Sequence, residues 1–251
     1  MNFLQKLKRS LIYKLKQKID IDSESLKELN LDQLFRFYNS DKGKSFTDSN
    51  KKIIKGHDYS NYYENHFKKL KNEKIHLLEI GVYAGSSSAA FAKYFPASTI
   101  YCLDINLKNF KYKSKKFKVH GIDVSNNNML NEFIQNINIG KDKECFNFII
   151  DDGSHKLSDQ IKCLSFFFKN LKKNGIYVIE EFNFSNIFPH LNDVPNEHKI
   201  IEILNFIKNK KSFKSNIITN EDIFFLINNV KKISTYEGAL KGSNIAFIEK
   251  K

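Results

Sequence analysis

From residue 74 onward the chain is a series of short apolar runs, each with an acidic residue at or near its end, separated by stretches of helical periodicity. Runs that are apolar on both faces and alternate with helices predict a parallel sheet covered by helices. The predicted strands are IHLLEIG (75–81), TIYCLDI (99–105), FKVHGID (117–123), FNFIIDD (146–152) and GIYVIEE (175–181), with helices such as Ser86–Tyr94 and Leu157–Asn170 between them.

The last fifth of the chain predicts an edge to this sheet. A helix is expected near Glu197–Lys210, followed by a strand near IFFLIN (223–228) and another at NIAFIEKK (244–251), which together would form an antiparallel hairpin. The 251 residues, 41% of them hydrophobic, are enough for one sizeable core. The predicted fold class is therefore α/β: a doubly wound, Rossmann-like sandwich around a mostly parallel seven-stranded sheet.

The N-terminal region has a different character. Residues 1–19 predict an amphipathic basic helix, and a second helix is expected over Ser23–Phe37, before a long polar loop. The first helix could lie on an anionic membrane, but docking on its own domain or on a partner subunit is the favoured interpretation. The predicted division is a helical extension and active-site lid over 1–70 and a catalytic domain over 71–251.

Charge and cysteine content limit the function less than the strand pattern does. Lys+Arg 41 against Asp+Glu 28 gives a net charge of +13, which is compatible with nucleic acid, an anionic membrane or a phosphorylated ligand. The lysines are spread along the whole chain, so this signal is discounted. Three cysteines at spacings unlike a zinc site or a disulfide framework predict reduced thiols, and no apolar run approaches the roughly 18 residues of a membrane span. A cytoplasmic location is expected.

One predicted site follows the first strand, in LLEIGVYAGSSS. Glycines let a backbone turn tightly against a ligand, and the next helix, capped by Ser86 or Ser87, offers free N–H groups. Acids that end the second and third strands could bind a ribose and an adenine edge. The glycine spacing is not GxGxxG, which disfavours NAD, and strand-end acids also cap helices. The predicted cofactor-binding residues here are Glu79, Gly81, Gly85, Ser86, Asp104 and Asp123.

A second predicted site follows the fourth and fifth strands, which are neighbours in the expected strand order. Asp152 would then lie close to Glu180 and Glu181. Three carboxylates without a cation repel one another, and oxygen ligands favour Mg²⁺, with Mn²⁺ or Ca²⁺ possible. His155, three residues beyond Asp152, is a candidate general base, since the pKa of histidine lies near neutral pH. Asp151 is expected to orient neighbouring groups or to cap a helix, in preference to binding the metal.

Five segments together resemble the metal-dependent sugar O-methyltransferases of the mycinamicin type: DKG, HDYSNYYENHF, LLEIGVYAGSS, IIDDGSHKLSDQ and GIYVIEE. The match spans Ser40–Phe182. It implies a class I methyltransferase fold, S-adenosylmethionine as donor, and Mg²⁺ or Mn²⁺ held by Asp152, Glu180 and Glu181. The metal pair is often Glu-Asp in the family and is Glu-Glu here, which could shift the metal or displace Glu181 from it.

The resemblance also implies roles for side chains outside the metal pair. His155 would deprotonate a sugar hydroxyl, with Asp152 beside it as the other catalytic residue. The DKG loop and the following helix would close over the pocket. Lys42 and Tyr63 would face the cofactor, and His57 and Tyr59 would face the substrate. Asp151, in the DDGSH segment, would also face the substrate. Homo-oligomers, dimers or tetramers with N-terminal contacts, are also implied.

The predicted function is methylation of a sugar hydroxyl. A nucleotide-activated heptose or deoxysugar, destined for a surface or capsular polysaccharide, is the expected acceptor. Small phenols, catechols and macrolide-linked sugars are alternatives within the same chemistry. Net charge alone favours a nucleic-acid methyltransferase, but DDGSH stands where such enzymes carry an NPPY-type turn. A membrane-associated scaffold using residues 1–19 is the remaining alternative, and no nucleic acid or membrane partner is expected.

Overall fold

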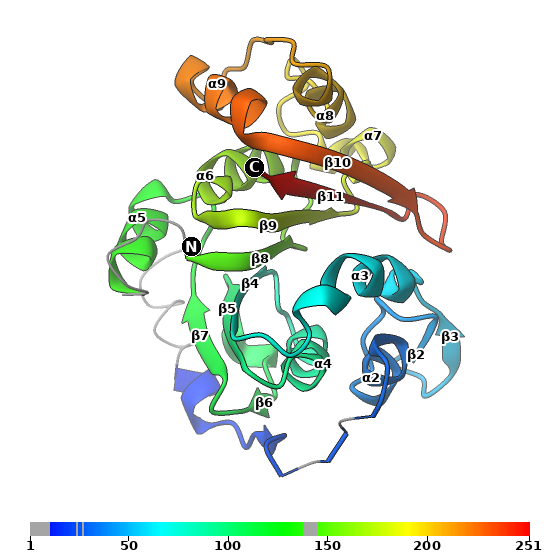
Figure 1. Cartoon of the computed structure of the whole chain (residues 1–251). Coiled ribbons are helices and arrows are strands. Elements are labelled where there is room, and N and C mark those ends of the chain that lie inside the picture. The colour runs from blue at the N-terminus through cyan, green and yellow to red at the C-terminus, as the bar shows by residue number, and fades with distance from the viewer. Residues whose placement is uncertain (1–10, 24, 27, 138–144) are drawn as a thin grey trace. The chain divides into compact units, whose positions relative to one another are not determined.

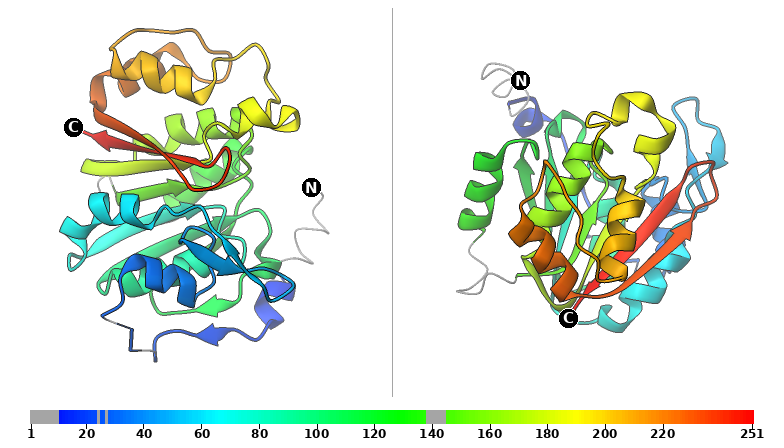
Figure 2. Two further views of the ribbon diagram at one scale, coloured as in Figure 1. Left: turned by 90° about the vertical axis from the view of Figure 1, so that its right-hand side faces the viewer. Right: turned by 90° about the horizontal axis from the view of Figure 1, so that it is seen from above.

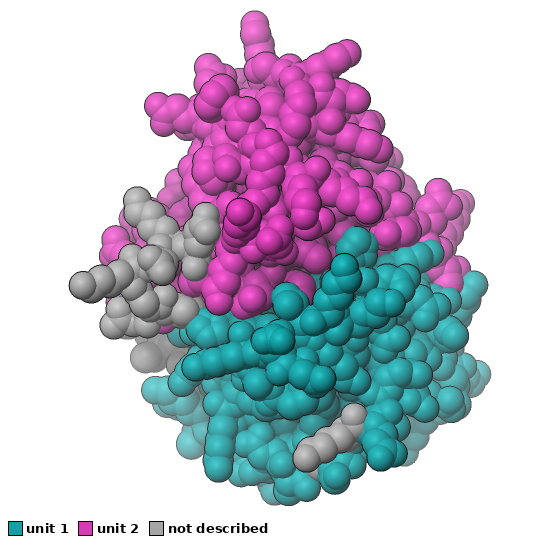
Figure 3. Space-filling view, in the orientation of Figure 1, with its two compact units in different colours: residues 1–123 teal, residues 124–251 magenta. Residues whose placement is uncertain are grey.

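The computed structural model describes residues 11–23, 25–26, 28–137 and 145–251 (Figure 1). These residues separate into two compact units, 1–123 and 124–251, coloured separately in Figure 3. The boundary between the units lies well beyond residue 70, where the sequence analysis divides a lid from a catalytic domain. That functional division stays a prediction, and each unit is described here by itself.

Three parallel strands form the sheet of the first unit. They are β4 (Ile75–Ile80), β5 (Ser98–Asp104) and β7 (Phe117–Gly121), with β5 in the middle. Leu77 pairs with Ile100, and Cys102 pairs with Val119. Side chains on both faces of β4 and β5 are buried, as the unbroken apolar runs predict.

The helices of this unit pack through aromatic side chains. They are α2 (Leu31–Phe37), α3 (Ser60–Phe67) with its continuation η1 (Lys68–Leu70), α4 (Ser86–Tyr94) and the short η2 (Leu107–Asn109). Phe35 of α2, Tyr63 of α3 and Phe91 of α4 meet edge to face, with ring centroids 5.4–6.2 Å apart. Two small sheets complete the unit: β1 (Ile19–Asp20) with β6 (Tyr112–Lys113), and β2 (Ser45–Thr47) with β3 (Ile53–Lys55).

Two predictions for the N-terminal region are wrong in their bounds. Residues 11–15 are helical, but Ile19 lies in strand β1, so the first helix does not reach it; residues 1–10 lie outside the described residues. Helix α2 begins at Leu31 instead of near Ser23. The reason is a capping box: Asn30 accepts from the Gln33 amide and Gln33 accepts from the Asn30 amide, each at 2.9 Å.

The second unit contains four strands of the main sheet. They are β8 (Phe146–Asp151), β9 (Leu171–Glu180), β10 (Val230–Glu237) and β11 (Asn244–Lys250), in the order β10-β11-β9-β8. Strands β8 and β9 are parallel, whereas β11 runs antiparallel to both of its neighbours. The helices of this unit, drawn from green to orange in Figure 2, are α5 (Asn127–Asn136), α6 (Leu157–Phe168), α7 (Phe184–Ile187), η3 (Pro189–Leu191), α8 (Ile200–Lys208) and α9 (Asn220–Asn229).

The predicted edge hairpin is confirmed, but one of its strands is not the predicted one. IFFLIN lies within helix α9, and the strand that pairs with β11 is β10. Thr219 caps this helix by accepting from the Asp222 amide at 3.1 Å. Ile223, Leu226 and Ile227 are buried while Phe224 is 71% exposed, so the apolar run has helical periodicity once the cap is recognised.

The full order of the main sheet is β10-β11-β9-β8-β4-β5-β7, seven strands with one antiparallel edge hairpin. This order confirms the predicted α/β fold class. Helix α4 has the bounds that the sequence predicts, and α6 ends two residues early, at Phe168. Among the described residues, none of the helices is both long and apolar enough to cross a membrane.

Candidate functional site

The carboxyl ends of β8 and β9 bring the predicted metal ligands of the second unit together. Asp151 pairs with Ile179, so Asp152 and Glu180 are the next residues on the two neighbouring strands. Parallel strands lie about 4.8 Å apart, and side chains that follow a matched pair share one sheet edge. The register therefore places Asp152 beside the Glu180–Glu181 pair, as the sequence predicts.

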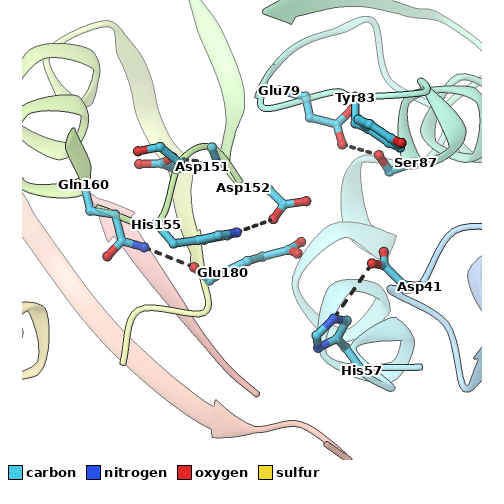
Figure 4. A network of polar contacts seen from close by, with 12 residues as sticks. Asp41, His57, Glu79, Tyr83, Ser87, Asp151, Asp152, His155, Gln160 and Glu180 are labelled. Atoms are coloured by element: carbon cyan, nitrogen blue, oxygen red, sulfur yellow. Dashed lines mark hydrogen bonds and ion pairs between the residues drawn. The ribbon is translucent and has the colours of Figure 1, made fainter. Parts of the chain in front are cut away.

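Three side chains at this edge form a cluster, Asp152, His155 and Glu181. One ligand atom from each lies within 4.8 Å of the others, and Nε2 of His155 is 3.6 Å from Oδ1 of Asp152. Glu181 is only 3% exposed, whereas the side chains of Asp152 and His155 are 22% and 21% exposed. The cluster is thus partly exposed to solvent at Asp152 and His155 and buried at Glu181. Figure 4 shows Asp152 and His155.

The backbone holds two of these residues in an unfavourable conformation. His155 has φ of 54° and Glu181 has φ of 49°, in the left-handed region that residues other than glycine rarely adopt. The Glu181 amide donates to the Asn244 carbonyl of β11 at 2.8 Å, and its carbonyl accepts from the Phe184 amide at 3.0 Å. The ring of His155 packs edge-on against Phe184, with centroids 5.3 Å apart. These contacts fix the two side chains toward Asp152.

Glu180 lies outside the group of three. Its side chain is buried, and its carbonyl accepts from Nε2 of Gln160 at 3.3 Å. Figure 4 shows the carboxylates of Glu180 and Asp152 extending in the same direction from their strands. The cluster therefore contains two of the three predicted ligands, Asp152 and Glu181, and adds His155, while metal binding by Glu180 stays a prediction.

The donor chemistry of the cluster fits a divalent cation. Two carboxylates and an imidazole are ligands for Mg²⁺ or Mn²⁺, with imidazole better suited to Mn²⁺. A carboxylate as buried as that of Glu181, beside a second acid, is costly without a cation because the like charges repel in a low dielectric. Asp152, Glu181 and His155 are the described residues that fit this role.

Asp151 is buried beside this edge, and its predicted contact with substrate stays a prediction. It is 3% exposed, and its Oδ2 accepts from the Tyr177 hydroxyl at 3.1 Å while Oδ1 accepts from the Gly153 amide at 3.4 Å. Burial raises the pKa of Asp151 to about 7, although both hydrogen bonds favour the ionised form. Alternation along β8 explains the difference from Asp152: consecutive strand residues point to opposite faces. Asp151 therefore supports the turn that carries Asp152, the orienting role considered above.

The glycine turn of the first unit follows β4. Gly81 and Gly85 have φ of 86° and 79°, and a Cβ on Gly85 would lie 2.6 Å from the Phe110 ring. The expected serine cap is wrong: Gly85 itself is the N-cap of α4, and Ser86 is the first helical residue. The turn thus leaves the first backbone N–H groups of α4 at the carboxyl end of the strand, a place where anionic and polar ligands bind.

Glu79 is a fully buried carboxylate on β4 that is hydrogen-bonded to the helix that follows this turn. The hydroxyls of Ser87 and Ser88 donate to its Oε1 and Oε2, each at 2.5 Å. The sequence analysis considers Ser87 only as a helix cap and does not single out Ser88, although an acid on a strand followed by a serine run on the next helix is a readable signal. The observed role of Glu79 is therefore to fix α4 against β4, and contact with a cofactor stays a prediction.

Asp104 and Asp123 end the next two strands of this unit. Oδ2 of Asp104 accepts from the Tyr83 amide and Oδ1 accepts from the Asn106 amide, both at 2.7 Å. A carboxylate oxygen has a second lone pair, so these bonds leave acceptor capacity for ribose hydroxyls. Asp104 is half-buried at the end of β5, next to the glycine turn, and Asp123 is half-buried just after β7. Their cofactor contacts stay predictions that this placement supports.

The predicted lid residues are largely core residues. Tyr59 and Tyr63 are fully buried, and Tyr63 lies in the aromatic cluster with Phe91. Lys42 is 2% exposed, and its carbonyl accepts from the Tyr59 amide at 2.8 Å. His57 stacks on Tyr59, with centroids 5.3 Å apart, and its Nε2 lies 3.9 Å from the Asp41 carboxylate. The DKG loop and the HDY segment are thus joined by backbone hydrogen bonds into one rigid structure.

Similarity to known proteins agrees with the resemblance found in the sequence. No family model matches the chain. It is 29% identical over 132 residues to mycinamicin VI 2''-O-methyltransferase of Micromonospora griseorubida, and 28% identical over 132 residues to demethylmacrocin O-methyltransferase of Streptomyces fradiae. Each match covers 50% of this chain, and 31% and 32% of those proteins respectively. The chain thus spans about a third of the curated relatives it matches.

The likeness to solved structures covers more of this chain than the sequence matches do. The MycE methyltransferase of the mycinamycin pathway, in complex with Mg, SAH and mycinamycin VI, superimposes with a TM-score of 0.67 at 20% identity, covering 89% of this chain and 55% of that one. A second crystal of MycE with Mg and SAH gives a TM-score of 0.65. At this identity the likeness establishes the fold, which is that of a class I methyltransferase, as the sequence resemblance implies.

Proposed function

We propose that this chain is an S-adenosylmethionine-dependent O-methyltransferase that acts on a sugar hydroxyl with the help of a divalent cation. The cluster of Asp152, His155 and Glu181 at the carboxyl end of β8 and β9 is the observation that carries the proposal. Similarity to named sugar O-methyltransferases and the shared fold support it.

The donor is assigned to the first unit. The positive-φ turn at Gly81 and Gly85 gives the backbone close access to a ligand, and Asp104 ends the next strand where a ribose can be bound. The Phe110 ring behind Gly85 leaves no room for a side chain at that position. These features support an adenosine-containing ligand more than a dinucleotide, since the GxGxxG spacing is missing.

The acceptor and the cation are assigned to the second unit. Asp152 and Glu181 would hold Mg²⁺ or Mn²⁺, with Glu180 as a further oxygen ligand beside them. A divalent cation bound here lowers the pKa of an acceptor hydroxyl and orients it. His155 receives the hydroxyl proton on Nε2, and Asp152, 3.6 Å away, stabilises the imidazolium that forms.

The step balances without another reactant. The acceptor oxygen forms a bond to the methyl carbon as the bond from that carbon to the sulfonium sulfur breaks. The products are a methyl ether, S-adenosylhomocysteine and a proton on His155. Positioning is expected to supply most of the rate in such a transfer, because binding both reactants removes the entropic cost of bringing them together.

Two forms of acceptor fit the proposal. One is a nucleotide-activated sugar, such as a heptose or deoxysugar, whose anionic diphosphate would need Lys or Arg side chains at close range. The other is a sugar already joined to a larger molecule, as in the relatives whose names specify macrolide or tetracenomycin sugars. Phenols and catechols are the alternative acceptor class.

We further propose a cytoplasmic homo-oligomer that serves surface polysaccharide synthesis. Leu11 and Leu15, in the helical residues 11–15, are 57% and 79% exposed, and such exposed apolar side chains support contact with a second subunit. Sedimentation of the purified protein measures the subunit number directly.

Incubation of the full chain with S-adenosylmethionine, Mg²⁺ and an acceptor panel tests the activity. The panel contains nucleotide sugars, free glycosides, disaccharides, catechol and short oligonucleotides. A sugar product heavier by one methylene, with the methyl position assigned by NMR, is the expected result. Methylation of catechol or of an oligonucleotide in preference to every sugar contradicts the proposal.

A further inference from the structure

A pocket of about 620 Å³ lies in the second unit, between α7 and the β10–β11 hairpin. Sites for small ligands have volumes of about 300–1,000 Å³, so the pocket can hold a ligand of one or two rings. Its walls include Phe182 and Asn183 just after β9, Asn186 of α7, and Thr235 and Tyr236 of β10. None of these residues belongs to the metal-ligand cluster.

The hairpin turn that closes the pocket is rigidly built. The Gly238 amide donates to the Ser243 carbonyl at 2.8 Å, and the Ser243 amide donates to the Leu240 carbonyl at 3.0 Å. Gly242 has φ of 82°, and a Cβ there would lie 2.5 Å from Cδ1 of Ile187. The turn therefore packs directly against α7, and its positive φ at this position favours glycine.

The pocket adjoins the cluster, because Asn244, one of its lining residues, is hydrogen-bonded to Glu181. The Glu181 amide donates to the Asn244 carbonyl, and the Asn183 amide donates to Oδ1 of Asn244 at 3.1 Å. Asn183 is two residues beyond Glu181, so their Cα atoms are at most about 7.6 Å apart. Phe184, the next residue, contacts the ring of His155. A ligand bound at the cluster can thus extend into the pocket over about one sugar ring.

The chemistry of the walls identifies the class of ligand. Amides and hydroxyls both donate and accept, as sugar hydroxyls require, and aromatic rings cover the apolar faces of sugars. One acid, Glu237, and one base, Lys241, balance each other, which is unlike the several cationic groups that hold a diphosphate. The polar side chains of the wall are Asn183, Asn186, Thr235, Ser243 and Asn244.

We infer that this pocket binds a neutral sugar ring that neighbours the methylated ring in the acceptor. The acceptor is then an oligosaccharide or glycoconjugate with at least two sugar units, in preference to a nucleotide-activated monosaccharide. The inference rests on the proposed function for the role of the neighbouring ring, and it adds a specificity site that the metal cluster does not supply.

Two substitutions remove polar groups of the pocket while keeping the number of side-chain heavy atoms, Thr235→Val and Asn186→Leu. Both side chains are exposed on the wall and neither lies in the cluster. Asn220→Leu, at an exposed position on α9 outside the pocket, is the matched control. Calorimetric titration with S-adenosylhomocysteine and with Mn²⁺ checks that each variant keeps its donor and metal affinity.

Binding is measured by saturation-transfer NMR with methyl glycosides of hexoses and 6-deoxyhexoses, with the corresponding disaccharides, and with a nucleotide sugar. We expect disaccharides to bind most tightly and the double variant to weaken that binding about tenfold, since two hydrogen bonds of ordinary strength are lost. In the methylation assay the same variant raises KM for the disaccharide and leaves KM for the monosaccharide glycoside and kcat unchanged.

The outcomes separate this inference from the proposed function. If no acceptor is methylated but the double variant still abolishes disaccharide binding, the pocket stands and the proposed function fails. If sugars are methylated but disaccharides show no advantage over monosaccharide glycosides, the function stands and the pocket assignment is overturned. The same holds if the nucleotide sugar is preferred and the double variant is unaffected. Absence of binding by every glycoside also overturns it.

Discussion

His155 and Glu181 lie at the ends of different loops, yet both adopt left-handed backbone conformations, with φ of 54° and 49°, and bring ligand atoms within 4.8 Å of each other. A non-glycine residue in this region costs on the order of 1–3 kcal/mol and persists only where its surroundings hold it. Here the β11 backbone and the Phe184 ring hold the pair. The strain is evidence for a role of these two side chains in function, since glycine would satisfy the backbone better.

Substitution of Glu181 is expected to weaken metal binding selectively. Glu181→Gln removes one negative charge from the cluster, and ligand charge is a main determinant of divalent-cation affinity. We expect the dissociation constant for Mn²⁺, measured by calorimetry, to rise at least about tenfold. Glu221→Gln, at an exposed acid in the first turn of α9, serves as the control. Equal affinity in both variants removes Glu181 from the metal site.

Metal dependence follows from the same cluster. Treatment of the active enzyme with a chelator is expected to abolish methyl transfer, and added Mg²⁺ or Mn²⁺ to restore it, because the acceptor hydroxyl is poorly ionised without a cation. Initial rates in the acceptor assay are the measurement. Full activity after exhaustive chelation contradicts the role given to Asp152 and Glu181.

His155→Asn separates a general base from a metal ligand. Asparagine tolerates positive φ, so the backbone is retained while the proton acceptor is lost. We expect turnover to fall about 10²–10⁴-fold, with unchanged affinity for S-adenosylhomocysteine and for Mn²⁺. His190→Asn, at an exposed histidine of η3 in the same unit, is the control. A matching loss of Mn²⁺ affinity would instead assign His155 as a ligand.

Ser88→Ala tests the buried hydrogen bonds beneath the glycine turn. The Glu79 carboxylate is fully buried and receives the hydroxyls of Ser87 and Ser88. Loss of one donor is expected to lower the free energy of unfolding by about 1–3 kcal/mol. Urea denaturation measures this change in free energy. Ser86→Ala, at a half-buried serine two residues earlier, is the reference. Equal midpoints for the two variants would show that Glu79 does not need the Ser88 hydroxyl.

Asp22 provides a pH-dependent contribution to stability in the first unit. The Ser114 hydroxyl donates to its Oδ1 at 2.6 Å and the Lys115 amide donates to its Oδ2 at 2.9 Å, and both bonds lower the pKa of Asp22. A carboxylate with a lowered pKa stabilises the fold above its ordinary pKa of about 4, and this contribution is lost as the pH falls through the folded-state value.

Asp22→Asn is therefore expected to destabilise the protein by about 0.5–1 kcal/mol at pH 7, a small effect because the site is exposed. The difference from the parent protein should shrink as the pH falls below about 4. Urea midpoints at pH 7 and pH 3 measure it. The same difference at both pH values would show that ionisation of Asp22 contributes nothing.

The residue pattern was sufficient for the parallel strands and for the acids that end them. Apolar runs such as FNFIID can be buried only in a sheet covered on both faces, and a polar residue that follows such a run must lie at the sheet edge. For that reason the sequence alone predicts that Asp152, Glu180 and Asp104 lie at strand ends. The pattern also predicts an antiparallel edge hairpin, but it misplaces one strand, which is β10 and not IFFLIN.

Other features depended on contacts between residues far apart in the sequence. IFFLIN has the composition of a strand, but the Thr219 cap and the burial of one face make it helix α9. Asp151 and Asp152 look alike in sequence, and the alternation of β8 turns one inward to Tyr177 and the other to the edge. Tyr63, expected near the cofactor, packs against Phe35 and Phe91 in the core, and its contact with a cofactor stays a prediction.

The sequence by itself determined the fold class and the edges of the sheet where chemistry can occur, because hydrophobic periodicity and strand ends are local properties of the chain. The tertiary structure decided which of two neighbouring acids joins the cluster, that His155 and Glu181 are strained toward Asp152, and that a polar pocket adjoins them. These depend on strand register, on left-handed backbone turns and on the packing of a distant hairpin, which no local pattern specifies.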